Sequence, residues 1–81
     1  MIIRFSPHAI KRMKQRFPFT MDRIASVIER GIREDRWTFA ACGRRKIEDF
    51  VAGERVRVVF EKGLMGQLTI VTVMWRDEPC T

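Results

Sequence analysis

The residue types best suited to proton and phosphate chemistry lie near the start of the chain, where His8, Arg12 and Arg16 recur at every fourth position. On an α-helix this spacing places the three side chains along one slanted stripe. An imidazole transfers protons near neutral pH, and a guanidinium donates paired hydrogen bonds to a phosphate group. The stripe therefore indicates chemistry on a phosphodiester.

Metal-independent cleavage of RNA needs three contributions from a protein. The 2′-hydroxyl group must lose a proton, the leaving 5′-oxygen must gain one, and the charge on the phosphoryl oxygens must be stabilised. His8 can fill the first or second role, and Arg12, Arg16 and an arginine from the sheet can fill the third. Arg57 is the candidate from the sheet, because it interrupts the outward side of a well-defined strand.

The same residues also have an ordinary structural interpretation. A histidine near a helix start is often an exposed or hydrogen-bonded side chain, and arginines and lysines often solvate a helix face. A run of cations near a turn can follow an RNA backbone or keep a sheet edge charged against aggregation. We expect RNA contacts from the following cations outside the catalytic set: Lys11, Arg16, Arg44, Arg45 and Lys46.

The overall charge favours a polyanionic partner. The 81-residue chain carries a net charge of +6 and has a pI of about 10.4. Nucleic acid is the default partner for such a chain. No apolar run approaches the roughly 20 residues that span a bilayer, and no signal peptide is recognisable at the start. We therefore expect a protein that meets RNA in the cytoplasm and has no membrane contact.

The chain offers little for metal or cofactor chemistry. It has a lone histidine, and Cys42 and Cys80 lie far apart without a metal-ligand spacing, so a structural zinc site is not expected and a reduced pair is the simplest interpretation. No Walker loop, dinucleotide-binding turn or serine elbow is present. The carboxylates form adjacent pairs that would point in opposite directions on strands: Glu34-Asp35, Glu48-Asp49 and Asp77-Glu78. We expect no metal and no cofactor.

Two helices are predicted in the N-terminal half. The first begins after the capping residue Ser6, runs from about residue 7 to 16, and ends before Pro18. Ile10, Met13 and Phe17 are expected beside the polar stripe. The second helix begins at Thr20 and ends at Gly31. Its core-facing stripe is expected to comprise Met21, Ile24, Ala25 and Ile28.

Strands are predicted in the C-terminal half. Residues 36–39 alternate as a strand, residues 44–51 look irregular, and a turn at Ala52-Gly53 precedes a strand that buries Val56, Val58 and Phe60. A loop at 62–66 leads to a buried strand at 67–75. The short connections favour antiparallel pairing. We predict one α+β domain over residues 1–81, with two N-terminal helices packed on a twisted antiparallel sheet of about four strands.

The N-terminal segment Ser6-Pro7-His8-Ala9-Ile10-Lys11-Arg12-Met13-Lys14-Gln15-Arg16 resembles the H-A-x-x-R-M-x-x-R opening of small bacterial domains similar to the BrnT and RelE toxins. The resemblance continues through a second helix ending in glycine, the Gly43-Arg44 turn, the valine-rich strand with Arg57 and the Ile-Val-Thr-Val strand. It implies the fold shared by barnase-like, EndoU-like, colicin-nuclease and RelE-like ribonucleases. Members of that group usually cleave RNA without metal, and a cognate antitoxin or immunity protein often neutralises them.

Carried to this sequence, the resemblance implies a catalytic set of His8, Arg12, Arg57 and Thr72, with Arg16 in support. The chain has no tyrosine, so a mechanism that uses a C-terminal tyrosine is excluded. Such nucleases occur alone or as the effector end of a larger secreted toxin, which would be delivered into a target-cell cytoplasm. Two alternatives to a ribonuclease stay open: a non-catalytic RNA-binding module, and a basic interaction protein that pairs with an acidic partner.

Overall fold

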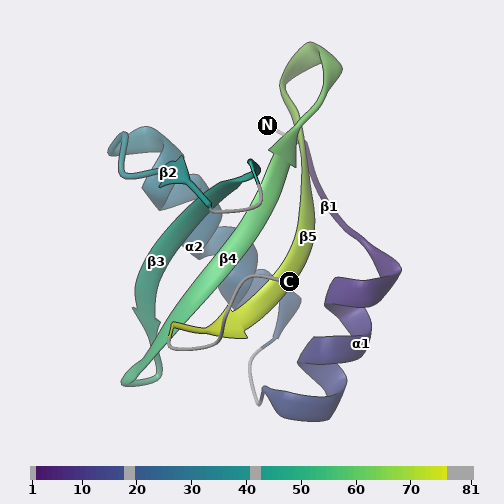
Figure 1. The fold of residues 1–81 in the computed structure, drawn as a ribbon, viewed down its shortest axis with the longest axis vertical. Coiled ribbons are helices and arrows are strands. Elements are labelled where there is room, and N and C mark those ends of the chain that lie inside the picture. Colours follow the sequence, from purple (N-terminus) through teal and green to yellow (C-terminus); the bar gives the residue numbers. More distant parts are fainter. Residues whose placement is uncertain (1, 18–19, 41–42, 77–81) are drawn as a thin grey trace.

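The computed structural model describes residues 2–17, 20–40 and 43–76 (Figure 1). In chain order the elements are β1 (Ile2–Phe5), α1 (Pro7–Arg16), α2 (Met21–Arg33), β2 (Thr38–Phe39), β3 (Arg45–Val51), β4 (Glu54–Lys62), a 3₁₀ turn (Leu64–Gly66) and β5 (Gln67–Trp75). The expectations for five residues fall outside the described part of the chain: Pro18, Cys42, Asp77, Glu78 and Cys80. Neither α1 nor α2 is long and apolar enough to cross a membrane.

The predicted α+β class is confirmed, and the predicted sheet needs correction. The sheet has five strands in the order β1-β5-β4-β3-β2, and β1 pairs with β5 in parallel. The other neighbours pair in antiparallel fashion. β1 is only four residues long, too short for a recognisable alternation pattern, and so it is missing from the sequence prediction. β5 lies inside the sheet, between β1 and β4, as its apolar sequence predicts.

β3 and β2 also differ from the sequence prediction. Residues 45–51, in the stretch with the less regular sequence pattern, form a continuous strand paired with β4. Its charged residues outnumber its apolar ones, which hides the alternation in the sequence. The strand expected at 36–39 contains only the two residues of β2. Cross-strand pairing with β4, which buries Val56, Val58, Val59 and Phe60, therefore decides the structure of this segment.

α2 covers one face of the sheet (Figure 1). It begins at Thr20, whose hydroxyl oxygen accepts a hydrogen bond from the backbone N–H of Arg23 at 3.3 Å. Met21 was expected in the core, but it is 49% exposed, because it lies in the first turn beyond the covered part of the sheet. The residues that α2 buries are Ile24, Val27, Ile28 and Gly31.

Gly31 lies inside α2 and does not end it, which corrects the sequence prediction. α2 continues to Arg33 and is capped by Glu34. A Cβ atom added at Gly31 would lie 2.5 Å from Cδ1 of Ile47 on β3. The missing side chain therefore lets the helix approach the sheet closely. The two uses of a glycine, close approach and helix termination, look the same in a sequence.

The register of β3, β4 and β5 separates the sheet into two faces. One row of aligned positions belongs to the hydrophobic core that α2 covers: Ile47, Val58 and Val73. The next row points to the opposite side, because side chains alternate along each strand: Glu48, Arg57 and Met74. We call this second side, opposite α2, the polar face. The expected burial of Val56, Val58 and Phe60 is confirmed.

Candidate active site

α1 begins at a fixed point on β5. Ser6 accepts a hydrogen bond from the backbone N–H of Ala9 at 3.0 Å, and its own hydroxyl donates to the carbonyl of Val71 at 2.8 Å. The backbone N–H of Ser6 donates to the carbonyl of Ile70 at 2.9 Å. The predicted N-cap therefore also ties the start of the helix to the sheet.

Val71 is the extra residue of a β-bulge in β5. The two consecutive β4 residues Val59 and Phe60 pair with Thr72 and Ile70, so Val71 has no paired residue on β4. The bulge keeps Ile70 in the core on one side of the irregularity and Thr72 on the polar face on the other. The carbonyl of the bulge residue Val71 also accepts the hydrogen bond from the Ser6 hydroxyl group.

α1 then runs beside the C-terminal half of β5, beyond the residues that pair with β1. Arg12 donates from Nε to the carbonyl of Val73 at 2.9 Å. At the end of the helix, the ring of Phe17 lies 4.4 Å, centroid to centroid, from the ring of Trp75. α1 thus replaces β1 as the neighbour of β5, and the predicted stripe of His8, Arg12 and Arg16 belongs to an element fixed along this strand. The buried side of α1 is made by Ala9, Met13 and Phe17; Ile10, expected with them, is only half-buried.

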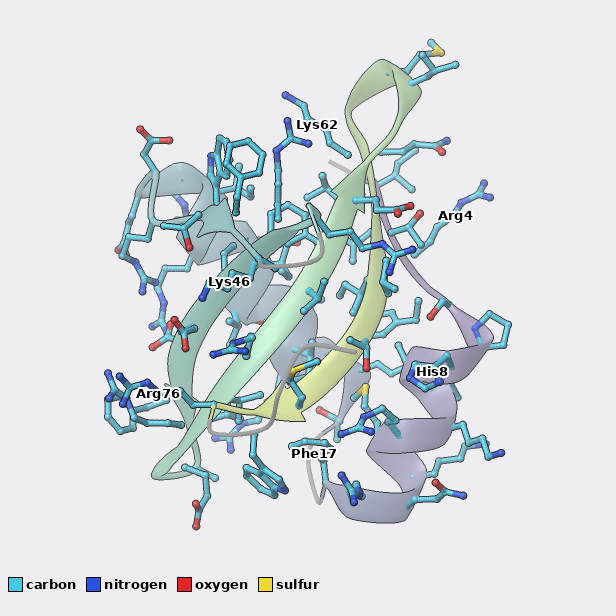
Figure 2. All side chains as sticks on the ribbon, viewed as in Figure 1. Arg4, His8, Phe17, Lys46, Lys62 and Arg76 are labelled. Atoms are coloured by element: carbon cyan, nitrogen blue, oxygen red, sulfur yellow. The ribbon has the colours of Figure 1, made fainter. Side chains whose placement is uncertain are left out.

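His8 lies in the first turn of α1 and is exposed. Figure 2 shows it on the side of the molecule from which the polar face is viewed. Arg12 follows one helical turn later and is partly buried, whereas Arg16 in the last turn is exposed. The imidazole is therefore accessible from the same side as the polar face.

Arg57 and Thr72 are diagonal neighbours on the polar face. Arg57 pairs with Met74, and Met74 and Thr72 lie two residues apart on the same side of β5. Thr72 is 9% exposed, and the side chain of Arg57 is 16% exposed. Val73, whose carbonyl accepts from Arg12, directly follows Thr72. The backbone register thus places Thr72 on the strand that α1 contacts, and Arg57 on the next strand, β4.

A carboxylate that the sequence analysis did not single out organises the polar face. Glu48 Oε2 lies 3.4 Å from Nη2 of Arg57 and 3.7 Å from Nε of Arg76, and Glu48 Oε1 lies 3.6 Å from Nζ of Lys46. Arg57 Nη2 also donates to the carbonyl of Arg76 at 2.9 Å. One carboxylate among three cations leaves this cluster positively charged. Only the β3–β4 register could have revealed Glu48, because it lies nine residues before Arg57.

The cations at 44–46, predicted as one RNA-binding group, diverge in the structure. Lys46 lies on the polar face, whereas Arg45 is at the α2 side of the sheet, with its Cζ atom 4.9 Å from the centroid of Trp37. Arg44 donates from Nε to Oε1 of Glu61 at 2.7 Å. Neighbouring strand residues point to opposite faces, which separates Arg45 from Lys46. Arg44 is held by Glu61, four residues beyond Arg57 on β4, so Lys46 is the cation of this group that joins Arg57.

Lys11 also lies apart from the stripe. It lines a shallow surface hollow of α1 together with Pro7, Ile10 and Lys14. Residues at 11 and 12 are separated by about 100° around a helix, so Lys11 and Arg12 point in different directions. Of the predicted RNA-binding residues, Lys46 lies on the polar face and Arg16 continues the stripe of α1 that contains His8 and Arg12.

Within residues 2–17, 20–40 and 43–76, the structure shows no group of three or more histidine, cysteine or carboxylate residues arranged to hold a metal ion. No protein-family model, curated protein or solved structure matches this chain. The fold and the candidate site thus define a small, basic α+β protein with an exposed histidine beside an arginine-bearing sheet face.

Proposed function

We propose that this protein is a metal-independent endoribonuclease that cleaves RNA by attack of the 2′-hydroxyl group on the adjacent phosphate. One observation carries the proposal: α1, which bears His8, is fixed by Arg12 to the carbonyl of Val73, next to Thr72 and one strand away from Arg57. The helix that carries a candidate proton-transfer group is thus fixed to the strand that carries a hydroxyl group, with a guanidinium on the next strand. These are the groups that the reaction needs.

Each residue has a distinct role in this proposal. His8 is accessible and transfers the proton of the attacking or leaving oxygen. Arg57, oriented by Glu48, stabilises the charge that develops on the phosphoryl oxygens. Thr72 donates its hydroxyl hydrogen to the same phosphate group. Arg12 positions α1, and therefore His8, through its hydrogen bond to Val73.

The proposed biological role is that of a toxin in a toxin–antitoxin or toxin–immunity pair that acts on RNA in the cytoplasm. The resemblance of the segment around His8 and Arg12 to BrnT-like and RelE-like toxins supports this role, and so does the net charge of +6. The expected partners are RNA and an inhibitory protein encoded with the toxin.

Induced expression in bacteria tests the proposal. We expect wild-type protein to arrest growth and to fragment total RNA, and the His8→Ala variant, expressed to the same level, to do neither. Normal growth and intact RNA in cells that accumulate folded wild-type protein would count against a ribonuclease toxin.

A non-catalytic RNA-binding module is the second candidate, and the contacts of the two arginines favour it. Arg57 is held by Glu48, and Arg12 donates to β5, as expected for cations that shape a binding surface. This alternative predicts salt-sensitive RNA binding with no product formed. Incubation of purified protein with labelled RNA, followed by gel analysis of both complex and fragments, separates the two candidates.

A further inference from the structure

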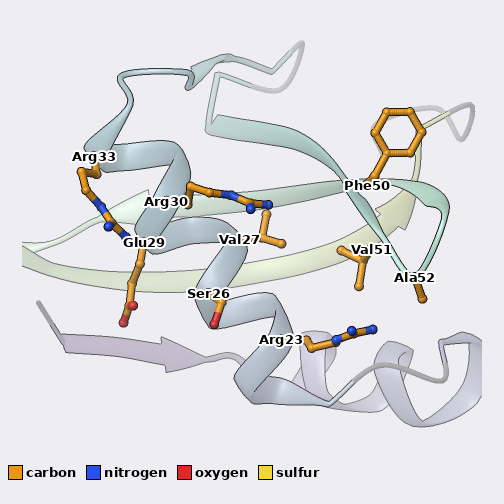
Figure 3. A pocket seen from close by; sticks show the side chains of 9 residues that line it. All are labelled: Arg23, Ser26, Val27, Glu29, Arg30, Arg33, Phe50, Val51 and Ala52. Atoms are coloured by element: carbon orange, nitrogen blue, oxygen red, sulfur yellow. The ribbon is translucent and has the colours of Figure 1, made fainter.

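A cation-lined cleft lies between α2 and the end of the β3–β4 hairpin (Figure 3). It has a volume of about 440 Å³. Val27 of α2 and Val51 of β3 form an apolar floor, and Arg23 and Arg30 lie beside it. Phe50 lies at the edge of the cleft, with its ring on the other side of β3. The cleft is on the α2 side of the sheet, away from the polar face.

The arginines of this cleft are placed by the helix. Arg23 and Arg30 are seven residues apart, which puts them on the same side of α2. Figure 3 shows both side chains extending from the helix toward β3 and the hairpin turn, whereas Arg33 lies beside Glu29. The described lining residues include three arginines and one glutamate, so positive charge predominates and the cleft attracts anions.

Asp49 fixes one of these arginines in position. Its Oδ2 atom accepts from Nη2 of Arg30 at 2.8 Å and from Nη2 of Arg36 at 3.1 Å. Burial alone raises the pKa of Asp49, but hydrogen bonds from the backbone of Phe50 and from the two arginines outweigh burial, and the pKa lies below its ordinary value. The carboxylate is therefore a stable anchor for Arg30 at neutral pH.

Phe50 connects the cleft to the polar face. This residue is 59% exposed, and the Cζ atom of Arg55 lies 5.2 Å from the centroid of its ring. Arg55 is two residues before Arg57 on β4, and its carbonyl accepts from the backbone N–H of Arg76 at 3.3 Å. Cations and an exposed aromatic ring therefore continue from the polar face, past the hairpin end, to the cleft.

We propose that this cleft binds a nucleotide of the same single RNA strand that the polar face engages. Arg23 and Arg30 hold its phosphate, its base lies against the valine floor, and the base of a neighbouring nucleotide stacks on Phe50 at the hairpin end. Guanidinium groups suit phosphate oxygens, and a base stacks on an aromatic ring whatever its identity, so the cleft binds without sequence preference. This inference rests on the proposed action on RNA, and it makes the substrate a single strand long enough to pass around the hairpin.

The test uses a fluorescent 12-mer of 2′-O-methyl uridylate, which cannot be cleaved by its own 2′-oxygen. Its dissociation constant is measured by anisotropy at several salt concentrations. We expect Arg23→Ala to weaken binding several-fold and to reduce the salt slope by about 0.7, the value for one phosphate contact on a single strand. We expect Phe50→Ala to weaken binding about tenfold through lost stacking.

Lys62→Ala is the matched control, because it removes one positive charge at the opposite end of β4. It should change affinity and salt slope much less than Arg23→Ala does. Equal effects of the two substitutions on affinity and salt slope would overturn the inference. Arg23 would then act only through the net positive charge of the protein, and not through a contact in the cleft. Circular dichroism of each variant checks that the fold is retained.

Amide chemical shifts of the wild-type protein with the same 12-mer separate this inference from the proposed function. Shifts at Ser26 and Ala52 together with those of the polar face support the cleft, even if unmodified RNA is not cleaved and the ribonuclease fails. Shifts confined to the polar face overturn the cleft and leave the ribonuclease standing. An absence of binding by the wild-type protein overturns both.

Discussion

For a single residue such as Arg12, the sequence predicts the secondary structure but not the long-range contacts. Its spacing from His8 correctly predicts a helix and a polar stripe. The residue that it contacts, Val73, lies 61 positions away, so no local pattern could identify the contact. Glu48 is hidden in the same way, because its effect on Arg57 depends on the pairing of β3 with β4.

Replacing Arg12 should affect both stability and activity. Arg12→Ala removes the donor to Val73, which we expect to lower the free energy of unfolding by about 1 kcal/mol, a typical value for one hydrogen bond. It should also lower the cleavage rate, because α1 loses a contact that positions His8. Chemical denaturation and a cleavage assay measure the two effects.

Lys11→Ala is the control for Arg12→Ala, since it removes the same charge from an exposed neighbour on the same helix. It should leave the stability within about 0.5 kcal/mol of wild type. If the two variants lose stability and activity to the same extent, Arg12 acts only through its charge and does not position α1.

Asp49 should contribute a pH-dependent stability. Its pKa in the folded protein is lowered, so its contribution is fully present above the unfolded-state pKa of about 3.9 and is lost as the pH falls through the folded-state pKa. Asp49→Asn should lower the free energy of unfolding by about 1–2 kcal/mol at pH 7, and the difference from wild type should shrink below about pH 4.

Urea denaturation of both proteins at a series of pH values measures this difference. Glu54→Gln, at an exposed carboxylate on β4, is the control for removal of one negative charge. A destabilisation by Asp49→Asn that stays the same from pH 7 to pH 2 would show that the contacts with Arg30 and Arg36 do not depend on the ionised carboxylate.

At the scale of elements, the predictability of each segment follows the strength of its pattern. Both helices begin at the predicted caps, Ser6 and Thr20, because a capping hydroxyl and a following apolar stripe are local signals. β4 and β5 are predictable from their runs of β-branched residues. β1 and β3 are not, because they are short or highly charged and owe their structure to the strands beside them.

The close approach of α2 to β3 makes Gly31 sensitive to any added side chain. In Gly31→Ala the new Cβ would lie 2.5 Å from Ile47 Cδ1, so the helix or the isoleucine must shift. We expect a loss of about 1–3 kcal/mol in the free energy of unfolding, the usual range for an overpacked core. Thermal or chemical denaturation provides the measurement.

Two further variants test the reason given for Gly31. Gly63→Ala introduces a Cβ no closer than 3.6 Å to its neighbours and should be nearly neutral. Ile47→Val, combined with Gly31→Ala, removes the Cδ1 atom involved in the clash and should be less destabilising than the sum of the two single changes. Strict additivity would show that the contact with Ile47 Cδ1 is not the cause of the destabilisation, because alanine has a higher helix propensity than glycine and would otherwise stabilise α2.

At the scale of the whole molecule, the sequence correctly predicts the α+β class but not the distribution of its charge. The net charge of +6 does not say where on the surface the cations lie. In the sequence, residues 44–46 look like one basic patch, but the strand register separates Arg45 from Lys46. The fold instead gathers Lys46, Arg57 and Arg76 around one carboxylate on the polar face. The candidate site is therefore a product of the sheet topology.

Metal-independent cleavage of RNA by 2′-hydroxyl attack, with His8 in proton transfer, can be tested on an oligonucleotide that has a single ribonucleotide in a deoxyribonucleotide strand. With EDTA present, the purified wild-type protein should cut only after the ribonucleotide and leave a 2′,3′-cyclic phosphate or a 3′-phosphate, identified by mass spectrometry. Folded His8→Ala should cut about 10²–10⁴-fold more slowly. Cleavage that EDTA abolishes and magnesium restores, or cutting of the all-deoxyribonucleotide strand, would contradict this account.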